Sequence, residues 1–391
     1  MSEPIKKLTI EGFKSIRKLE DFELRSLNVL IGANGAGKSN FVGFFRLLRE
    51  LIEQKLQLAV RTEGGADACL YMGPRVTRQL SAKLYFGANG YEFALVPTAD
   101  NQLAFADEAT VFSGQLKNHI RRSLGSGHIE AQLKARKDEP GIIGRHGVPH
   151  YVFNAVSSWV VYHFHDTSAS ASVRRQGSIN DNEFLRPNAD NLAAFLYRIR
   201  QTNLSTYEKI RDVVRLAAPF FDDFKLRPVP TNPELIQLEW LQRDSDYPFR
   251  PSQLSDGTLR FICLATALLQ PVPPPTMLFD EPELGLHPYA LTILANLFKQ
   301  PALQYGSFVV LKQIIVSTQS APLLNEFAPE DVIVVERTHG ESTFRRLESS
   351  HLSEWLNEYA LGELWQKNVL GGRPQSEETP LSSNVGGDHR S

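Results

Sequence analysis

Cysteine is nearly absent from this sequence. Its 391 residues include only Cys69 and Cys263, which lie far apart and outside any C-x-x-C motif. Two isolated thiols cannot form a disulfide framework or a cysteine zinc site, and they fit a reducing cytoplasm. Cys263 lies in the apolar stretch FICLATALL, where we expect a small buried core residue.

Long apolar runs and an excess of one charge are also missing. No run approaches the roughly 20 residues of a membrane-spanning helix, and no charged-then-apolar leader opens the chain. We therefore expect a cytoplasmic protein without a membrane partner. The 42 Lys and Arg residues against 44 Asp and Glu give a net charge of −2, which excludes coating nucleic acid by charge alone but permits a local basic patch.

The hydropathy pattern changes period along the chain. Alternation over the first 31 residues predicts short strands with a turn at Gly12, and residues 39–55 predict a buried helix. Residues 79–112 predict an antiparallel meander, whereas residues 114–149 indicate a surface excursion with one helix. The length favours two or three compact units.

The second half of the chain alternates between helix and strand patterns. Residues 188–218 predict two amphipathic helices, and short strands follow around FKLRP and LIQLEW. From LSDGT to DVIVVE the order of apolar segments is typical of a mostly parallel sheet with helices on its faces.

A glycine-rich loop between an apolar strand and a helix matches G-x-x-x-x-G-K-[ST], the P-loop or Walker A motif. Glycines let backbone N–H groups wrap round phosphates, and the helix N-terminus adds further donors. Lys38 is expected to reach the β- and γ-phosphates of ATP, and the Ser39 hydroxyl to hold Mg²⁺. The expected nucleotide contacts are Gly32, Ala33, Asn34, Gly35, Ala36, Gly37, Lys38, Ser39 and Asn40.

Two acids end the apolar strand TMLFDE, which is the Walker B pattern. Asp280 is expected to bind Mg²⁺, directly or through water. Glu281 is expected to orient and deprotonate the attacking water.

The stretch LSDGT opens an apolar helix, and here the sequence resembles the ABC-type ATPases, which carry LSGGQ at this point. The resemblance implies that Ser255, Asp256 and Gly257 face the γ-phosphate bound by a second protomer. It therefore implies a dimer or higher oligomer that closes on two nucleotides. A plain helix cap formed by Ser255 is the alternative for this motif alone.

Three further positions follow from the same resemblance. PELGLHP resembles the D-loop region and implies that Glu283, Gly285 and His287 lie at the dimer interface, although His287 equally suits a helix cap. Gln319 in STQS stands where most relatives have a switch histidine; it can hydrogen-bond a phosphate oxygen or water but carries no positive charge, which puts fast hydrolysis in doubt. Lys14 in GFKS matches a nucleotide-contacting position, and no glutamine stands out as the Q-loop residue.

Among ABC-type proteins, the chain resembles the stand-alone RecF-like and OLD-like predicted ATPases over roughly residues 5–370. It lacks the heptads and C-x-x-C hook of long-armed SMC-type repair proteins, and no acidic cluster after DVIVVE indicates the fused nuclease of OLD proteins. This implies an α/β P-loop fold with an antiparallel β lobe and a helical insertion. The expected divisions are an ATPase lobe at 1–113, an insertion at 114–250, a second lobe at 251–370 and a disordered tail at 371–391.

The resemblance implies an ATP-driven, DNA-associated sensor in repair or anti-phage defence with a separately encoded effector. Alternatives are a slowly hydrolysing scaffold that holds an effector inactive, or a transporter's ATPase subunit, which LSDGT disfavours.

Two side-chain clusters admit both a functional and a structural interpretation. His163, His165 and Asp166 could be metal ligands, yet no further ligand stands at a recognisable spacing, so a hydrogen-bonded structural role is favoured. A basic stretch could contact a DNA backbone or form a solvated helix face, which is slightly favoured. Its basic residues include Lys117, Arg121, Arg122, Lys134, Arg136, Lys137 and Arg145.

Overall fold

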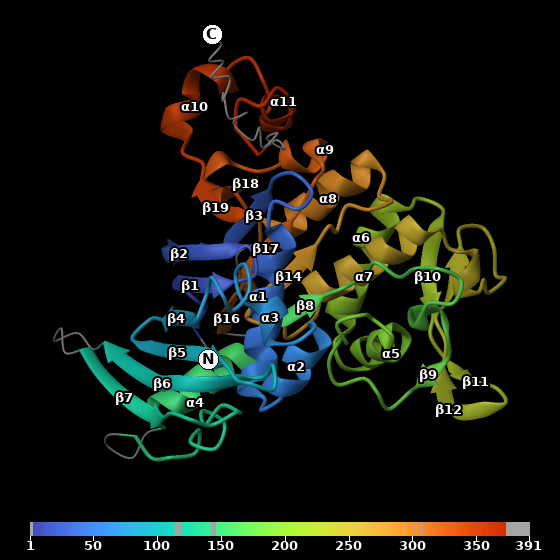
Figure 1. Cartoon of the computed structure of the whole chain (residues 1–391). Helices are drawn as coiled ribbons and strands as arrows, with labels where there is room; N and C mark the ends of the chain where they lie inside the picture. The colour runs from blue at the N-terminus through green and yellow to red at the C-terminus, as the bar shows by residue number, and fades with distance from the viewer. Residues whose placement is uncertain (1–2, 114–118, 142–145, 301, 306–307, 373–391) are drawn as a thin grey trace, which may run out of the picture.

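The computed structural model describes residues 3–113, 119–141, 146–300, 302–305 and 308–372. Two six-stranded sheets dominate these residues, one antiparallel and one mostly parallel, with helices against them (Figure 1). The expected α/β class, with a parallel core and an antiparallel β lobe, is confirmed. Of the tail expected at 371–391, residues 373–391 lie outside the described residues, as do Lys117 and Arg145.

The antiparallel sheet contains the expected meander, with β1 and β2 added at one edge and β7 at the other. β1 continues through Gly12, and the chain reverses instead at Lys14 and Ser15 because Phe13 pairs with Ile16. Within residues 114–149, where a surface excursion with one helix is expected, the structure has the strand β7, and a helix begins only at Val148. In spatial order the strands are β2 (Ile16–Glu23), β1 (Lys7–Phe13), β4 (Leu80–Phe86), β5 (Asn89–Pro97), β6 (Leu103–Ser113) and β7 (His119–Gly125).

The second sheet brings the nucleotide motifs to one edge. Five of its strands are parallel, and only β19 runs antiparallel, to its neighbour β18. In a parallel sheet the carboxyl ends of the strands form the usual ligand-binding edge. The order is β19 (Glu341–Arg346), β18 (Val332–Thr338), β3 (Leu27–Ile31), β17 (Gln313–Ser317), β14 (Thr276–Asp280) and β8 (Val160–Tyr162).

The two predicted amphipathic helices of residues 188–218 are α5 and α6, and the other expected long helices are α1, α7 and α8. The helices are α1 (Lys38–Ile52), α2 (Leu56–Thr62), α3 (Ala66–Cys69), α4 (Val148–Ser157), α5 (Leu192–Thr202), α6 (Leu204–Ala217), α7 (Asp256–Leu269), α8 (Pro288–Phe298), α9 (Ala321–Leu324), α10 (Ser349–Leu356) and α11 (Leu361–Gln366). The short strands are β9 (Gly177–Ser178), β10 (Phe221–Lys225), β11 (Pro228–Val229), β12 (Asn232–Ile236), β13 (Glu239–Gln242), β15 (Ala302–Tyr305) and β16 (Phe308–Leu311).

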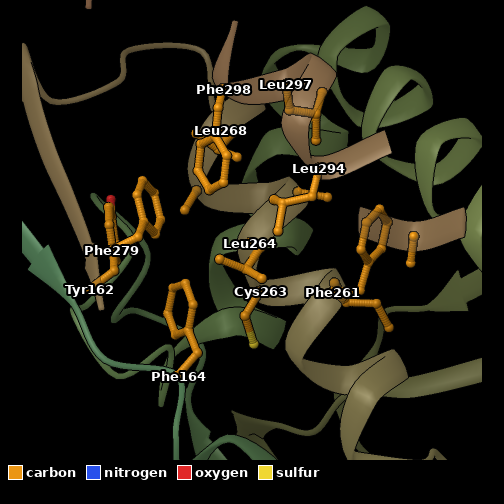
Figure 2. Close-up of a cluster of buried hydrophobic side chains, with 14 of the residues drawn as sticks. Tyr162, Phe164, Phe261, Cys263, Leu264, Leu268, Phe279, Leu294, Leu297 and Phe298 are labelled. Atoms are coloured by element: carbon orange, nitrogen blue, oxygen red, sulfur yellow. The ribbon is translucent and has the colours of Figure 1, made fainter. Parts of the chain in front are cut away.

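The central strands β3, β17 and β14 are buried along almost their whole length, and most of their residues are apolar. Successive residues of β14 alternate between two hydrophobic cores: Leu278 packs with α1 and the antiparallel sheet, whereas Met277 and Phe279 pack with α5 to α8. Figure 2 shows part of the second core, where Tyr162, Phe164 and Phe279 lie beside Leu264 and Leu268 of α7. No helix among the described residues is long and apolar enough to cross a membrane.

Candidate nucleotide-binding site

The glycine-rich loop connects β3 to α1 at the carboxyl edge of the parallel sheet. Gly37 adopts φ +117°, and a Cβ there would lie 2.2 Å from the Ser342 Oγ, so only glycine fits. The Lys38 ammonium is buried and donates to the carbonyls of Gly32 at 2.6 Å and Ala33 at 3.0 Å. Ser39, by contrast, is exposed at the first turn of α1.

The two Walker B acids lie at the same edge. Asp280 is level with Ser317 of β17, whose hydroxyl donates to the Asp280 carboxylate. Burial lowers the pKa of Lys38, while the negative charges of Glu281 and Asp280 act in the opposite direction. Because β3 and β14 both pair in parallel with β17, the loop that carries Lys38 and the two acids lie at the same edge of the sheet, as a single phosphate site requires.

Gln319 connects two glutamates. Its side-chain amide donates to the Glu281 carboxylate, and its backbone N–H donates to Glu283 Oε1 at 2.8 Å. Glu281 itself has a left-handed backbone, φ +44°, and its N–H donates to the Ser317 carbonyl at 2.9 Å. This network holds the Glu281 carboxylate next to the Gln319 amide. Glu281 is expected to orient the attacking water, and Gln319 is expected to contact phosphate.

The turn between β1 and β2 supports the loop from the other side. Asn40 donates to Ser15 Oγ at 2.6 Å, and the Ser342 hydroxyl donates to the Ala36 carbonyl at 2.6 Å. Lys14, expected to contact nucleotide, instead pairs with Glu63 at 2.6 Å beside this turn. The Lys14 ammonium is therefore directed toward Glu63 at the end of α2.

The signature residues form the N-terminus of α7. Ser255 Oγ accepts from the Thr258 N–H at 3.1 Å, which is the helix cap, and Asp256 pairs with the buried Arg174 at 2.7 Å. A Cβ on Gly257 would lie 2.1 Å from the Gly285 carbonyl oxygen, so this turn packs directly on the loop after Walker B. Within the described chain, no hydrogen bond or ion pair joins these residues to the glycine-rich loop.

His287 caps α8. Its Nδ1 accepts from the Tyr289 N–H at 3.2 Å, which confirms the capping alternative. The same residue lines a half-open cavity of about 110 Å³ with Ser255, Gly257 and Gly285. The expected dimer-interface residues Gly285 and His287 therefore surround the signature turn, whereas Glu283 turns inward to Gln319.

The histidine cluster after β8 is bonded within the protein. His163 Nε2 lies 2.9 Å from the Arg46 guanidinium, and because arginine only donates, that nitrogen must accept. Burial, and then the positive charge of Arg46, lower the pKa of His163 to about 4. Among the residues that the structure describes, no group of three or more His, Cys, Asp or Glu side chains has metal-binding geometry.

The described part of the basic stretch is largely neutralised by ion pairs. Arg121 and Arg122 lie on β7, which corrects the expected helix face. Arg121 pairs with Glu92 at 3.0 Å and also with Asp107. The remaining contacts are Arg122 and Arg136 with Glu139, Lys134 with Glu53, and Lys137 over the Phe153 ring.

Three site residues carried no sequence signal. Ser342 supports the loop from β19, more than 300 residues away in sequence, while Arg174 and Arg260 bond mostly to backbone carbonyls. Such contacts depend on the fold and follow no motif or spacing.

Known proteins match part of the sequence and the whole fold. Residues 154–325, which contain LSDGT, Walker B and Gln319, match the family described as "AAA domain, putative AbiEii toxin, Type IV TA system". No curated protein matches. The solved Smc head bound to the C-winged helix domain of ScpA aligns at TM-score 0.57 and 16% identity, covering 90% of this chain and 99% of that one.

A second solved structure is similar. The Smc head domain with an extended coiled coil, bound to the C-terminal domain of ScpA from Pyrococcus furiosus, aligns at TM-score 0.51 and 15% identity, covering 91% of this chain and 99% of that one. The chain therefore has the fold of the ABC-like P-loop ATPase heads. At these identities the likeness is one of fold, and activity is argued from the site.

Proposed function

We propose that this chain is a Mg²⁺-dependent ATPase head that closes as a homodimer around two ATP molecules. The observation that carries the proposal is the convergence of Lys38, Asp280 and Glu281 at one edge of the parallel sheet, where β3 and β14 both pair with β17, with Gln319 bonded to Glu281. Positive charge, a strand-end carboxylate and a hydrogen-bonded glutamate are the groups that phosphoryl transfer to water requires.

Each residue has a role in this mechanism. Lys38 and the loop N–H groups bind the phosphates, and Glu281 accepts the proton of the attacking water while Gln319 fixes its carboxylate. Ser39 and Asp280 offer oxygen ligands that suit Mg²⁺, which is usually bound by one or two protein groups plus phosphate. When bound, the ion neutralises charge that develops on the transferred phosphoryl group.

The signature turn supports action in trans. A helix N-terminus with Ser and Gly attracts anions, and the α7 turn borders an open cavity without bonding to its own phosphate loop in the described structure. We place Ser255 and Gly257 of one protomer over the γ-phosphate of the other, with Asp256 beside it. Lys14 is assigned to the edge of the nucleotide site.

The biological role in our proposal is an ATP-gated, DNA-associated sensor for repair or anti-phage defence that acts on a separately encoded effector. It rests on the resemblance to RecF-like and OLD-like ATPases. One observation favours a second candidate, a slowly hydrolysing scaffold that holds an effector inactive: Gln319, in place of a switch histidine, carries no charge to stabilise the transition state.

ATP turnover by wild type, Glu281→Gln and Lys38→Ala, with and without DNA, tests the proposal. We expect Glu281→Gln to lower turnover about 10²- to 10⁴-fold, and to accumulate an ATP-bound dimer visible by light scattering. Lys38→Ala should lose both binding and dimerisation.

DNA stimulation of the wild type supports the sensor. Tight ATP binding with negligible turnover supports the scaffold. A Glu281→Gln protein that binds ATP but stays monomeric contradicts the dimeric mechanism.

A further inference from the structure

Two buried arginines, Arg174 and Arg260, connect segments that the proposed mechanism assigns to different nucleotides. Arg260, on α7, donates from Nε to the Phe164 carbonyl at 2.8 Å and from a terminal nitrogen to the His165 carbonyl at 2.9 Å. Its other terminal nitrogen donates to the Leu284 carbonyl, in the loop after Walker B. One side chain thus joins three segments.

Arg174 makes a parallel set of contacts. It donates to the Thr167 carbonyl at 2.8 Å, to the Leu254 carbonyl at 3.2 Å and to Asp256 Oδ1 at 2.7 Å. It also donates to the Pro251 carbonyl. Asp256 stands where the ABC-type motif has glycine, and Arg174 is its charge partner. We call Arg174 and Arg260 with their partners the arginine clasp.

The segment held by the clasp lies beside the Walker B acids. Because Tyr162 of β8 pairs with Phe279 of β14, the next residue, His163, is level with Asp280. The Tyr162 and Phe279 rings stack with centroids 5.3 Å apart, and Phe164 lies against the same core (Figure 2). A displacement at the end of β14 would therefore act first on β8 and on the residues that directly continue it.

Arg260 also lines one small cavity together with His165, Asp280 and Glu281. In the described structure it donates to carbonyls and one hydroxyl, so its buried charge is solvated by fixed dipoles of residues 164–167 and 284. Separating α7 from those carbonyls would leave the buried guanidinium without acceptors, which is strongly unfavourable. The segment and the helix are thus constrained to move together.

We propose that the arginine clasp transmits nucleotide occupancy from a protomer's own Walker site to the signature turn it offers its partner. Arg174 and Arg260 are positioning residues, since neither is placed on the nucleotide. This inference rests on the proposed function: ATP at Lys38 and Asp280 fixes residues 163–167, and the clasp then orders α7.

The test is amide hydrogen exchange of residues 256–260 in the Glu281→Gln background, at a protein concentration too low for dimers. We expect ATP to slow exchange about 10-fold in the parent and to have no effect in Arg260→Lys, whose single nitrogen cannot span three carbonyls. ATP affinity, measured with a fluorescent ATP analogue, should change less than 2-fold. ATP-driven dimerisation should weaken about 10-fold.

Arg346→Lys is the matched control. Arg346 also bonds backbone carbonyls, those of Glu330 and Glu23, but at the far end of the sheet. Its variant should keep the ATP-dependent protection. If Arg260→Lys fails to fold, Arg174→Lys, which removes the other set of contacts and changes no residue placed on the nucleotide, provides the same comparison.

Protection that persists in Arg260→Lys, or in Arg174→Lys where Arg260→Lys does not fold, overturns the clasp, and so does its absence from a parent that binds ATP. A parent that does not bind ATP refutes instead the proposed function, so the two failures are distinguishable.

Discussion

Glu283 is the carboxylate of the site that is most poorly solvated. One oxygen accepts from the Gln319 N–H, and the other is buried without a hydrogen-bond partner in the described residues. Burial is the largest cause of its raised pKa. A carboxyl with a raised folded-state pKa binds its proton more tightly when folded, so stability falls as pH rises above the unfolded-state pKa of about 4.3.

Glu283→Gln should therefore stabilise the protein at neutral pH. The amide keeps an oxygen for the Gln319 N–H but never ionises. The gain in the free energy of unfolding should be near zero at pH 4 and should increase as the pH rises through the raised pKa of Glu283. Urea unfolding from pH 4 to 8 measures this.

Glu330→Gln is the control of opposite sign, because hydrogen bonds from Ser349 lower the pKa of Glu330. This variant should lose stability at neutral pH, and its deficit should shrink as pH falls through the lowered pKa. A Glu283→Gln protein less stable than wild type at pH 8 contradicts the prediction.

At the scale of the element, Gly43 in the second turn of α1 and Gly257 in the first turn of α7 should respond in opposite ways to an added methyl group. A Cβ added to Gly43 in α1 would have no neighbour within 4 Å, whereas a Cβ on Gly257 would meet the Gly285 carbonyl at 2.1 Å. Gly43→Ala should stabilise by about 0.5–1 kcal/mol, and Gly257→Ala should destabilise by about 1–3 kcal/mol.

Gly257→Ala should also weaken ATP-driven dimerisation without changing ATP affinity, because the added methyl group would push the start of α7 away from the loop after Walker B. Urea unfolding and light scattering measure both effects. Unaltered dimerisation by Gly257→Ala would show that this turn does not need to pack on Gly285.

The elements that sequence alone predicts are those with local signals. The glycine-rich loop, its flanking strand and helix, and the apolar strand ending in Asp280 have a period or a motif that local physics explains. β7 was missed because adjacent arginines interrupt its alternation and its pairing with β6 decides its structure. The clasp was missed because Arg260 bonds carbonyls 96 residues away, which no local pattern encodes.

At the scale of the whole molecule, the parallel sheet links two hydrophobic cores. Leu278 faces one core and Phe279 the other, so neither core can open fully without disrupting the same strands. Each core contains one of the two cysteines: Cys69 packs with α1 and the antiparallel sheet, and Cys263 packs with α5 to α8. The sharing of strands predicts that both cores unfold as one unit.

Thiol labelling of Cys69→Ala and Cys263→Ala, each with one remaining cysteine, tests this. Burial raises the pKa of Cys69 to about 11 and that of Cys263 to about 12, so neither thiol should react until the protein opens. We expect equal labelling rates for the two variants. ATP at about 100 times its Kd should slow both by about 100-fold, because it stabilises the folded state by about 2.7 kcal/mol.

Guanidinium-unfolded protein is the control for full reactivity. Faster labelling of Cys263 that ATP does not slow would mean that the α5 to α8 core opens separately, and would place the flexible unit of the molecule on the signature side of the sheet.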